Sequence, residues 1–122
     1  MVYNREGRLA LFNPFMESLV GLPAKDVVGK LPCEAFPFLE ELGVPKGLER
    51  ALRGEQVQFP PAAWALESTG RSGWASSTQA PLRDNRGEIV GVIETVTDLT
   101  ELHRVQEKEK QLEVGLQHTH KL

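Results

Sequence analysis

Hydrophobic positions in the first part of the chain come in short groups separated by turn residues. Apolar runs at 2–4 and 9–12 flank Gly7, which can adopt the positive φ of a tight turn, so they predict a β-hairpin. Asn13 and Pro14 then indicate the start of a helix, because Asn is a good N-cap and Pro fits the first helical position. The apolar spacing that follows is helical.

The next segment is rich in proline and glycine, which interrupt regular structure. It leaves room only for single helical turns, predicted near 24–27, 33–36 and 38–42. A longer helix is predicted over 45–53, where a proline lies near the start and apolar residues recur four positions apart.

After residue 54 the spacing changes to the alternation typical of strands. Three strands are predicted at about 56–67, 73–83 and 88–98, and the turn residues between them favour antiparallel pairing. Pro60 and Pro61 interrupt the first, so that strand is expected to be bent or at a sheet edge. Apolar residues occupy both faces of the last strand, so each face is expected to be covered.

From Asp98 onward the pattern is helical again. Asp98 or Thr100 is expected to cap this helix, with Glu101 placed as in a capping box. Apolar residues fall at alternating a and d positions of a heptad, with Glu109 as a polar member, which is the pattern of a helix that pairs with another. The predicted dimer stripe consists of Leu102, Val105, Glu109, Leu112 and Leu116.

These elements predict an α+β fold. The early hairpin cannot form a stable sheet alone, so it is expected to join the later strands in a five-stranded antiparallel sheet. The short helices are expected to cover one face, and part of the terminal helix, or a partner, the other. The chain divides into a core at 1–98 and an amphipathic linker helix at 99–122.

Composition narrows the functional classes. The chain has 122 residues, 40% of them hydrophobic and 25% charged, which suits one globular domain. A net charge of −3 argues against nucleic-acid binding. No apolar run approaches the roughly 18 residues of a membrane span, so no membrane contact is expected. The single Cys33 gives no sign of an oxidising compartment, so a cytoplasmic location is predicted.

Several short motifs, in their order and spacing, carry a resemblance. They are residues 4–8 followed by 12–14, Leu19-Val20-Gly21, Val28-Gly29-Lys30, Pro81-Leu82-Arg83-Asp84, residues 87–92, and Asp98-Leu99-Thr100-Glu101. Together they resemble the PAS family of sensory domains over nearly the whole chain. The last motif is similar to the family's Asp-Ile-Thr output motif, which implies signal transmission through Asp98, Thr100 and Glu101.

The resemblance implies a PAS-like fold and a role in signal relay. In relatives, the strand-to-helix junction passes a change in the sheet to a helix that continues toward a kinase, a cyclase or a transcription-control module. Residues 117–122 look similar to those just ahead of the phosphoacceptor helix of sensor histidine kinases. His118 and His120 precede the place where that motif would begin.

A small-molecule pocket between the short helices and the sheet is the binding site that the resemblance leaves open. Its candidate lining residues are Phe36, Phe38, Leu48, Leu52, Trp64, Trp74 and Ile93. The alternative is that these side chains only fill the core at normal density.

The sequence argues against haem, flavin and metal sites. The histidines all lie in the terminal helix, away from the helical side of the core that supplies the ligand in haem-binding relatives. Cys33 lacks the Asn-Cys-Arg context of the flavin adduct in light-sensing relatives. His118 and His120 have no accompanying carboxylate or thiol cluster, which argues against a metal site.

The sequence therefore predicts a signal-sensing and relay module without catalytic residues, in a multidomain signalling protein such as a two-component sensor histidine kinase. It is expected to form a homodimer through the terminal helix and to act on an effector domain of the same parent chain. The alternative is a small-molecule or cofactor-binding domain that regulates a transcription regulator or cyclase.

Overall fold

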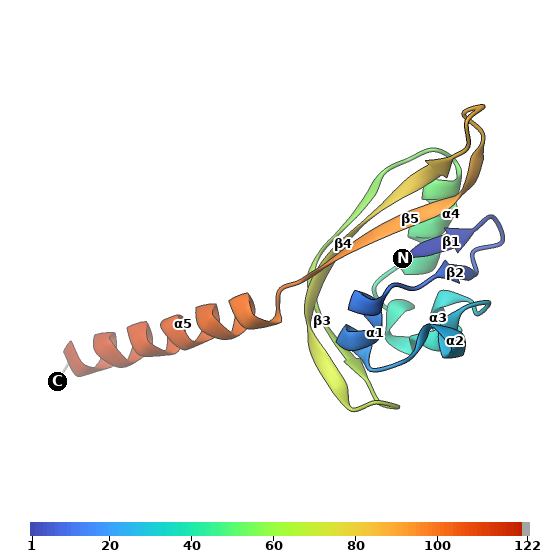
Figure 1. The fold of residues 1–122 in the computed structure, drawn as a ribbon. Helices are drawn as coiled ribbons and strands as arrows, with labels where there is room; N and C mark the ends of the chain where they lie inside the picture. Colours follow the sequence, from blue (N-terminus) through green and yellow to red (C-terminus); the bar gives the residue numbers. More distant parts are fainter. Residues whose placement is uncertain (121–122) are drawn as a thin grey trace.

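The computed structural model describes the backbone of residues 1–120 and the side chains of residues 1–116. A five-stranded antiparallel sheet carries short helices on one face, and one long helix continues from the end of its central strand (Figure 1). The predicted α+β class is thus confirmed. The side chains of His118 and His120, and residues 121–122 of the predicted linker, lie outside the described residues.

The sheet has the strand order β2-β1-β5-β4-β3, so the first two strands join the last three as expected. Its strands are β1 (Val2–Asn4), β2 (Leu9–Leu11), β3 (Val57–Leu66), β4 (Arg71–Arg83) and β5 (Ile89–Asp98). β1 can lie close to β5 because Gly91 lacks a side chain: a Cβ there would lie 2.2 Å from the carbonyl oxygen of Tyr3.

The helical elements match the predicted segments within one to three residues at most ends. They are α1 (Pro14–Val20), α2 (Ala24–Val27), α3 (Pro32–Ala35), the 3₁₀ helix η1 (Pro37–Leu39), α4 (Val44–Leu52) and α5 (Thr100–His120). The predicted cap of α1 is present, since the Asn13 side chain accepts a hydrogen bond from the Met16 amide at 3.0 Å.

The prolines of β3 have the predicted effect. β3 lies at the edge of the sheet, and its register with β4 shifts between Phe59 and Ala62, where Pro60 and Pro61 supply no amide donors.

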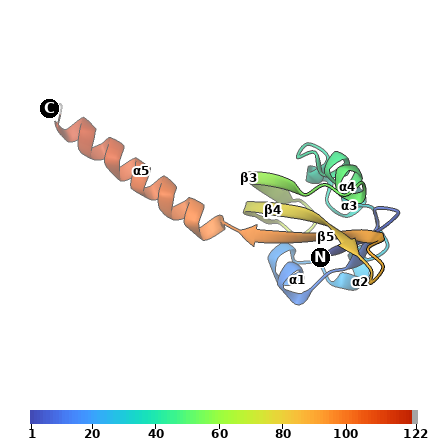
Figure 2. The same ribbon diagram turned by 90° about the horizontal axis from the view of Figure 1, so that it is seen from above.

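On the outer face of the sheet, the terminal helix does not provide the predicted cover, and cover by a partner stays a prediction. α5 projects away from the core and does not fold back over the strands (Figures 1 and 2). Ile93 of β5 and Leu11 of β2 are therefore 41% and 63% exposed. Both lie on the row Leu11–Val2–Ile93–Ala80, which runs across neighbouring strands through the register of each pair. The described residues of this chain leave the outer face uncovered.

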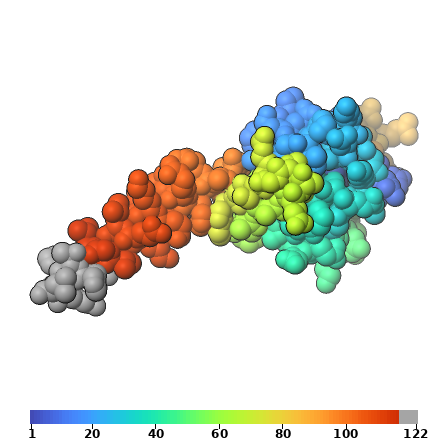
Figure 3. All heavy atoms as spheres, turned by 90° about the horizontal axis from the view of Figure 1, so that it is seen from below, coloured from blue at the N-terminus to red at the C-terminus, as the bar shows by residue number. Residues whose placement is uncertain are grey.

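The core lies on the inner face, between the sheet and the short helices. Tyr3, Leu9 and Val92 from the strands are at most 1% exposed, and Val27 and Ala51 from the helices are fully buried. The long helix adds nothing to this core, as its separation in the space-filling view shows (Figure 3).

Candidate functional site

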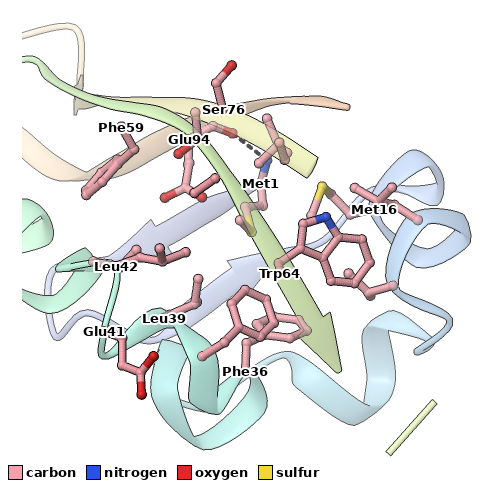
Figure 4. Close-up of a pocket in the computed structure, with 18 of the residues that line it drawn as sticks. Met1, Met16, Phe36, Leu39, Glu41, Leu42, Phe59, Trp64, Ser76 and Glu94 are labelled. Atoms are coloured by element: carbon pink, nitrogen blue, oxygen red, sulfur yellow. Dashed lines mark hydrogen bonds between the residues drawn. The ribbon is translucent and has the colours of Figure 1, made fainter. Parts of the chain in front are cut away.

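An interior cavity of about 270 Å³ opens between the short helices and the inner face of β3, β4 and β5. Its lining is mostly apolar (Figure 4). The lining residues are Met1, Met16, Leu19, Val20, Phe36, Phe38, Leu39, Glu41, Leu42, Val44, Phe59, Pro60, Ala62, Trp64, Ala75, Ser76, Ser77, Glu94 and Val96. An apolar cavity with few polar groups is the usual form of a small-molecule site.

Aromatic rings build one wall of this cavity. Phe36 lies 6.1 Å from Phe38, and Phe38 lies 5.9 Å from Trp64, measured between ring centroids. Such spacings are favourable for tilted aromatic pairs. The wall therefore joins the segment around η1 to strand β3.

Three of the predicted pocket residues line the cavity, namely Phe36, Phe38 and Trp64. The other four do not, which corrects the prediction. Leu48 is buried in the core, and Leu52 packs against that core. Trp74 and Ile93 belong to the opposite face of the sheet, because side chains alternate along a strand.

Sequence reasoning missed the buried acidic residue that lines the cavity, Glu94. It is 4% exposed, and its Oε1 accepts a hydrogen bond of 2.6 Å from Nε2 of Gln79, which is fully buried. A glutamate between valine-rich neighbours on the inward register of β5 was the available signal. Burial raises the pKa of Glu94, while the Gln79 hydrogen bond and the charge of the Met1 amino group act in the opposite direction.

Burial and the negative charge of Glu94 also raise the pKa of Tyr3 well above its usual range, with burial the larger cause. Cys33 is a free thiol whose Sγ donates to Glu40 Oε2 at 3.2 Å. Burial and this carboxylate raise its pKa to about 11, so Cys33 is a poor nucleophile.

The start of α5 is attached to β4 through Trp74. The Leu99 amide donates to the Trp74 carbonyl at 2.8 Å, and the Trp74 amide donates to Oγ1 of Thr100 at 3.1 Å. The Trp74 indole stacks on the His103 imidazole. One strand residue therefore holds the first turn of the helix by backbone and side chain.

Asp98 and Thr100 contact each other at this junction, and their role in signal transmission stays a prediction. Asp98 Oδ1 accepts from the Thr100 amide at 3.1 Å and from its hydroxyl at 2.6 Å. The predicted capping box is wrong, because Glu101 instead pairs with Arg104 on the exposed side of the helix.

The cavity wall and the helix start meet at Gly73 of β4. A Cβ built there would lie 2.3 Å from Thr100 Oγ1 and 3.2 Å from Trp64 Nε1. Both groups thus occupy the space that any other side chain would need. Trp64 Nε1 is buried and has no hydrogen-bond partner among the described residues.

The family model of the PAS fold matches residues 1–104. The chain belongs to the PAS family. This confirms the family that the motifs resemble, and the chain is therefore a signal-sensing PAS domain. A comparison with curated protein sequences gives no match.

Solved PAS structures share this fold at low identity. A PAS domain from Colwellia psychrerythraea has a TM-score of 0.64 and 18% identity, with 82% of this chain and 84% of that one covered. The PAS domain of the histidine kinase ThkA has a TM-score of 0.62 and 24% identity, with coverages of 80% and 95%.

VqmA of Vibrio cholerae, in a complex with ligand and DNA, has a TM-score of 0.68 and 21% identity. The alignment covers 81% of this chain and 45% of VqmA, so this chain spans less than half of that protein. VqmA is also known as a dimer and bound to DPO.

Two negative findings apply to the described part of this PAS domain. None of its helices is both long and apolar enough to cross a bilayer. No group of three or more His, Cys, Asp or Glu side chains gathers there in a way that could hold a metal ion.

Proposed function

We propose that this PAS domain is a non-catalytic sensory and relay module of a larger cytoplasmic signalling protein, in which occupancy of the cavity biases the direction or register of α5. The observation that carries the proposal is the meeting of Trp64 and Thr100 at Gly73. Trp64 lines the cavity and Thr100 begins the helix. Because both side chains flank Gly73, a shift of Trp64 on ligand binding would reach Thr100 through this part of β4.

We expect the signal to pass from the sheet to α5 by a switch between two conformations of the junction between β5 and α5. The start of α5 is held to β4 chiefly through Trp74. The Leu99 amide donates to the Trp74 carbonyl, the Trp74 amide donates to Oγ1 of Thr100, and the Trp74 indole stacks on the His103 imidazole. A small shift of β4 therefore changes how the helix leaves the sheet without disturbing the core.

The proposal includes a homodimer formed through α5. Leu102, Leu112 and Leu116 are 53%, 61% and 68% exposed on a helix that touches the core only at its start. An exposed heptad stripe of this kind is stabilised when a second helix packs on it. The uncovered row of Ile93 and Leu11 on the outer face gives a second copy a further apolar surface.

The association state tests the role of α5. In sedimentation equilibrium, residues 1–122 should form a dimer. Residues 1–98, which lack α5, should form a weaker dimer or remain monomeric. Equal monomeric behaviour of the two proteins would remove the helix from the mechanism.

We further propose that the effector is a sensor histidine kinase. The support is the likeness of residues 117–122 to the segment ahead of a phosphoacceptor helix, together with the fold shared with the PAS domain of ThkA. The parent protein should incorporate acid-labile phosphate on histidine from ATP labelled at the γ-phosphate. Absence of labelled histidine in an active preparation would contradict this effector class.

The second candidate is a ligand-binding domain that controls a transcription regulator or cyclase. The cavity favours it, as does the shared fold with VqmA, which is known with ligand and DNA. Native mass spectrometry of freshly purified protein would support this reading if it found one bound molecule per chain.

A further inference from the structure

Among the described residues that line the cavity, Glu94 is the only buried acidic one. Glu94 is 4% exposed, whereas the other acidic lining residue, Glu41, is exposed at the rim. In Figure 4 the Glu94 side chain reaches from the sheet toward Leu42, and the Ser76 hydroxyl points away from it. Lysine, arginine and histidine are missing from the described residues that line the cavity.

One of the two carboxyl oxygens of Glu94 has no hydrogen-bond donor among the described residues. Oε1 accepts from Gln79, but Oε2 accepts no hydrogen bond from any described residue. The Met1 amino group lies nearby, yet it donates to the backbone carbonyl of Glu94 at 3.0 Å and not to the carboxyl. The Gln79 hydrogen bond and the nearby Met1 ammonium offset only part of the cost of burying this carboxylate, so a further donor at Oε2 would stabilise its charged form.

The volume of the cavity limits the size of the molecule that could carry this hydrogen-bond donor. An engineered cavity of about 150 Å³ holds benzene, and this one measures about 270 Å³. It therefore suits a molecule of about two fused rings, on the order of ten non-hydrogen atoms. The aromatic wall of Phe36, Phe38 and Trp64 favours a flat, apolar body.

We propose that the cavity binds a small, largely apolar amine whose protonated nitrogen donates to Oε2 of Glu94 while its hydrocarbon body packs against the aromatic wall. This inference rests on the proposed sensory role of the cavity and names the ligand class. A carboxylate ligand is disfavoured because two buried negative charges would lie together.

Four probes with the same ring skeleton test the proposal: 2-aminoindane, indan-2-ol, indane and indane-2-carboxylate. Binding to the full chain is followed by ¹H–¹⁵N NMR, in which the indole signals of Trp64 and Trp74 report separately. The amine should bind about tenfold or more tightly than the alcohol or the hydrocarbon, since hydrogen bonds to charged groups are strong. The carboxylate should not bind, and the Trp64 signal should shift more than that of Trp74.

Glu94→Gln should lower the affinity for 2-aminoindane to that of indan-2-ol or indane. Its affinity for indane should stay unchanged, and this result would show that the cavity is intact. Glu88→Gln removes an exposed carboxyl just before the same strand and should bind the amine like the wild type. The proposal is overturned if the amine and the alcohol bind equally, if no probe binds, or if Glu94→Gln retains the preference. Amine binding without any change in α5 would contradict the relay but not the ligand class.

Discussion

The indole of Trp74 stacks on the imidazole of His103, with ring centroids 3.8 Å apart and an interplanar angle of 23°. The contact joins the outer face of β4 to the first turn of α5. It lies on the opposite side of the sheet from Trp64, although both tryptophans are in neighbouring strands. The two tryptophans of this domain therefore belong to different sites, Trp64 to the cavity and Trp74 to the start of α5.

The first prediction separates these two tryptophans. Trp64→Ala should lower the free energy of unfolding by about 3–5 kcal/mol, because it empties a buried site. Trp74→Ala should cost only about 0.5–1.5 kcal/mol, the value of an aromatic contact, yet it should speed hydrogen exchange at the start of α5. Urea unfolding and amide exchange measure the two effects, and similar core destabilisation by both variants would contradict the assignment.

Gly73 provides the second prediction. Gly73→Ala should destabilise the domain by about 1–3 kcal/mol, because its Cβ meets Thr100 Oγ1 and Trp64. In a double-mutant cycle, Thr100→Ala should recover part of this loss because it removes the clashing oxygen, whereas Thr100→Ser should not. Additive effects in the cycle, measured by urea unfolding, would show that the two positions do not interact.

The third prediction concerns pH. The folded state holds the Glu94 proton more tightly than the unfolded chain, whose carboxyl has its ordinary pKa of 4.5. The unfolded state therefore loses this proton first, and the wild type loses stability as pH rises from 4.5 to the raised pKa of the folded protein. Glu94→Gln should lack this loss, so its stability relative to the wild type should increase over that range.

Urea unfolding at a series of pH values measures this dependence. Glu88→Gln, which changes an exposed carboxyl, is the control and should give a curve parallel to that of the wild type. A Glu94→Gln curve that is also parallel to the wild type would mean that burial of this acid has no energetic effect.

The fourth prediction concerns the proposed dimer. Glu109→Leu should tighten association about tenfold or more, because a polar residue at a core position of a coiled coil lowers its stability. Lys110→Leu adds the same side chain outside the heptad stripe and should leave association near the wild-type value. Sedimentation equilibrium distinguishes the two, and equal tightening would indicate nonspecific contact between exposed leucines.

The sequence by itself determined the order and type of the elements, because that information is local. The change of hydrophobic spacing after residue 54, the Asn13 cap and the prolines of β3 each act within a few residues of their position. Alternation along β5 showed that both of its faces are apolar, but it did not show which face lies inward: Ile93 was predicted to line the pocket and lies on the outer face. The predicted cover of that face by a partner stays a prediction. The outer face stays open because nothing local directs α5 across it.

Only the tertiary structure decided which residues share a site. Trp74 and Trp64 look alike as large apolar residues, and their faces depend on the pairing register of β4 with β3 and on the start of α5. Glu94 of β5 accepts a hydrogen bond from Gln79 of β4, and Trp64 of β3 and Thr100 of α5 both flank Gly73 of β4. Such contacts arise from packing between distant segments, so no spacing along the chain encodes them.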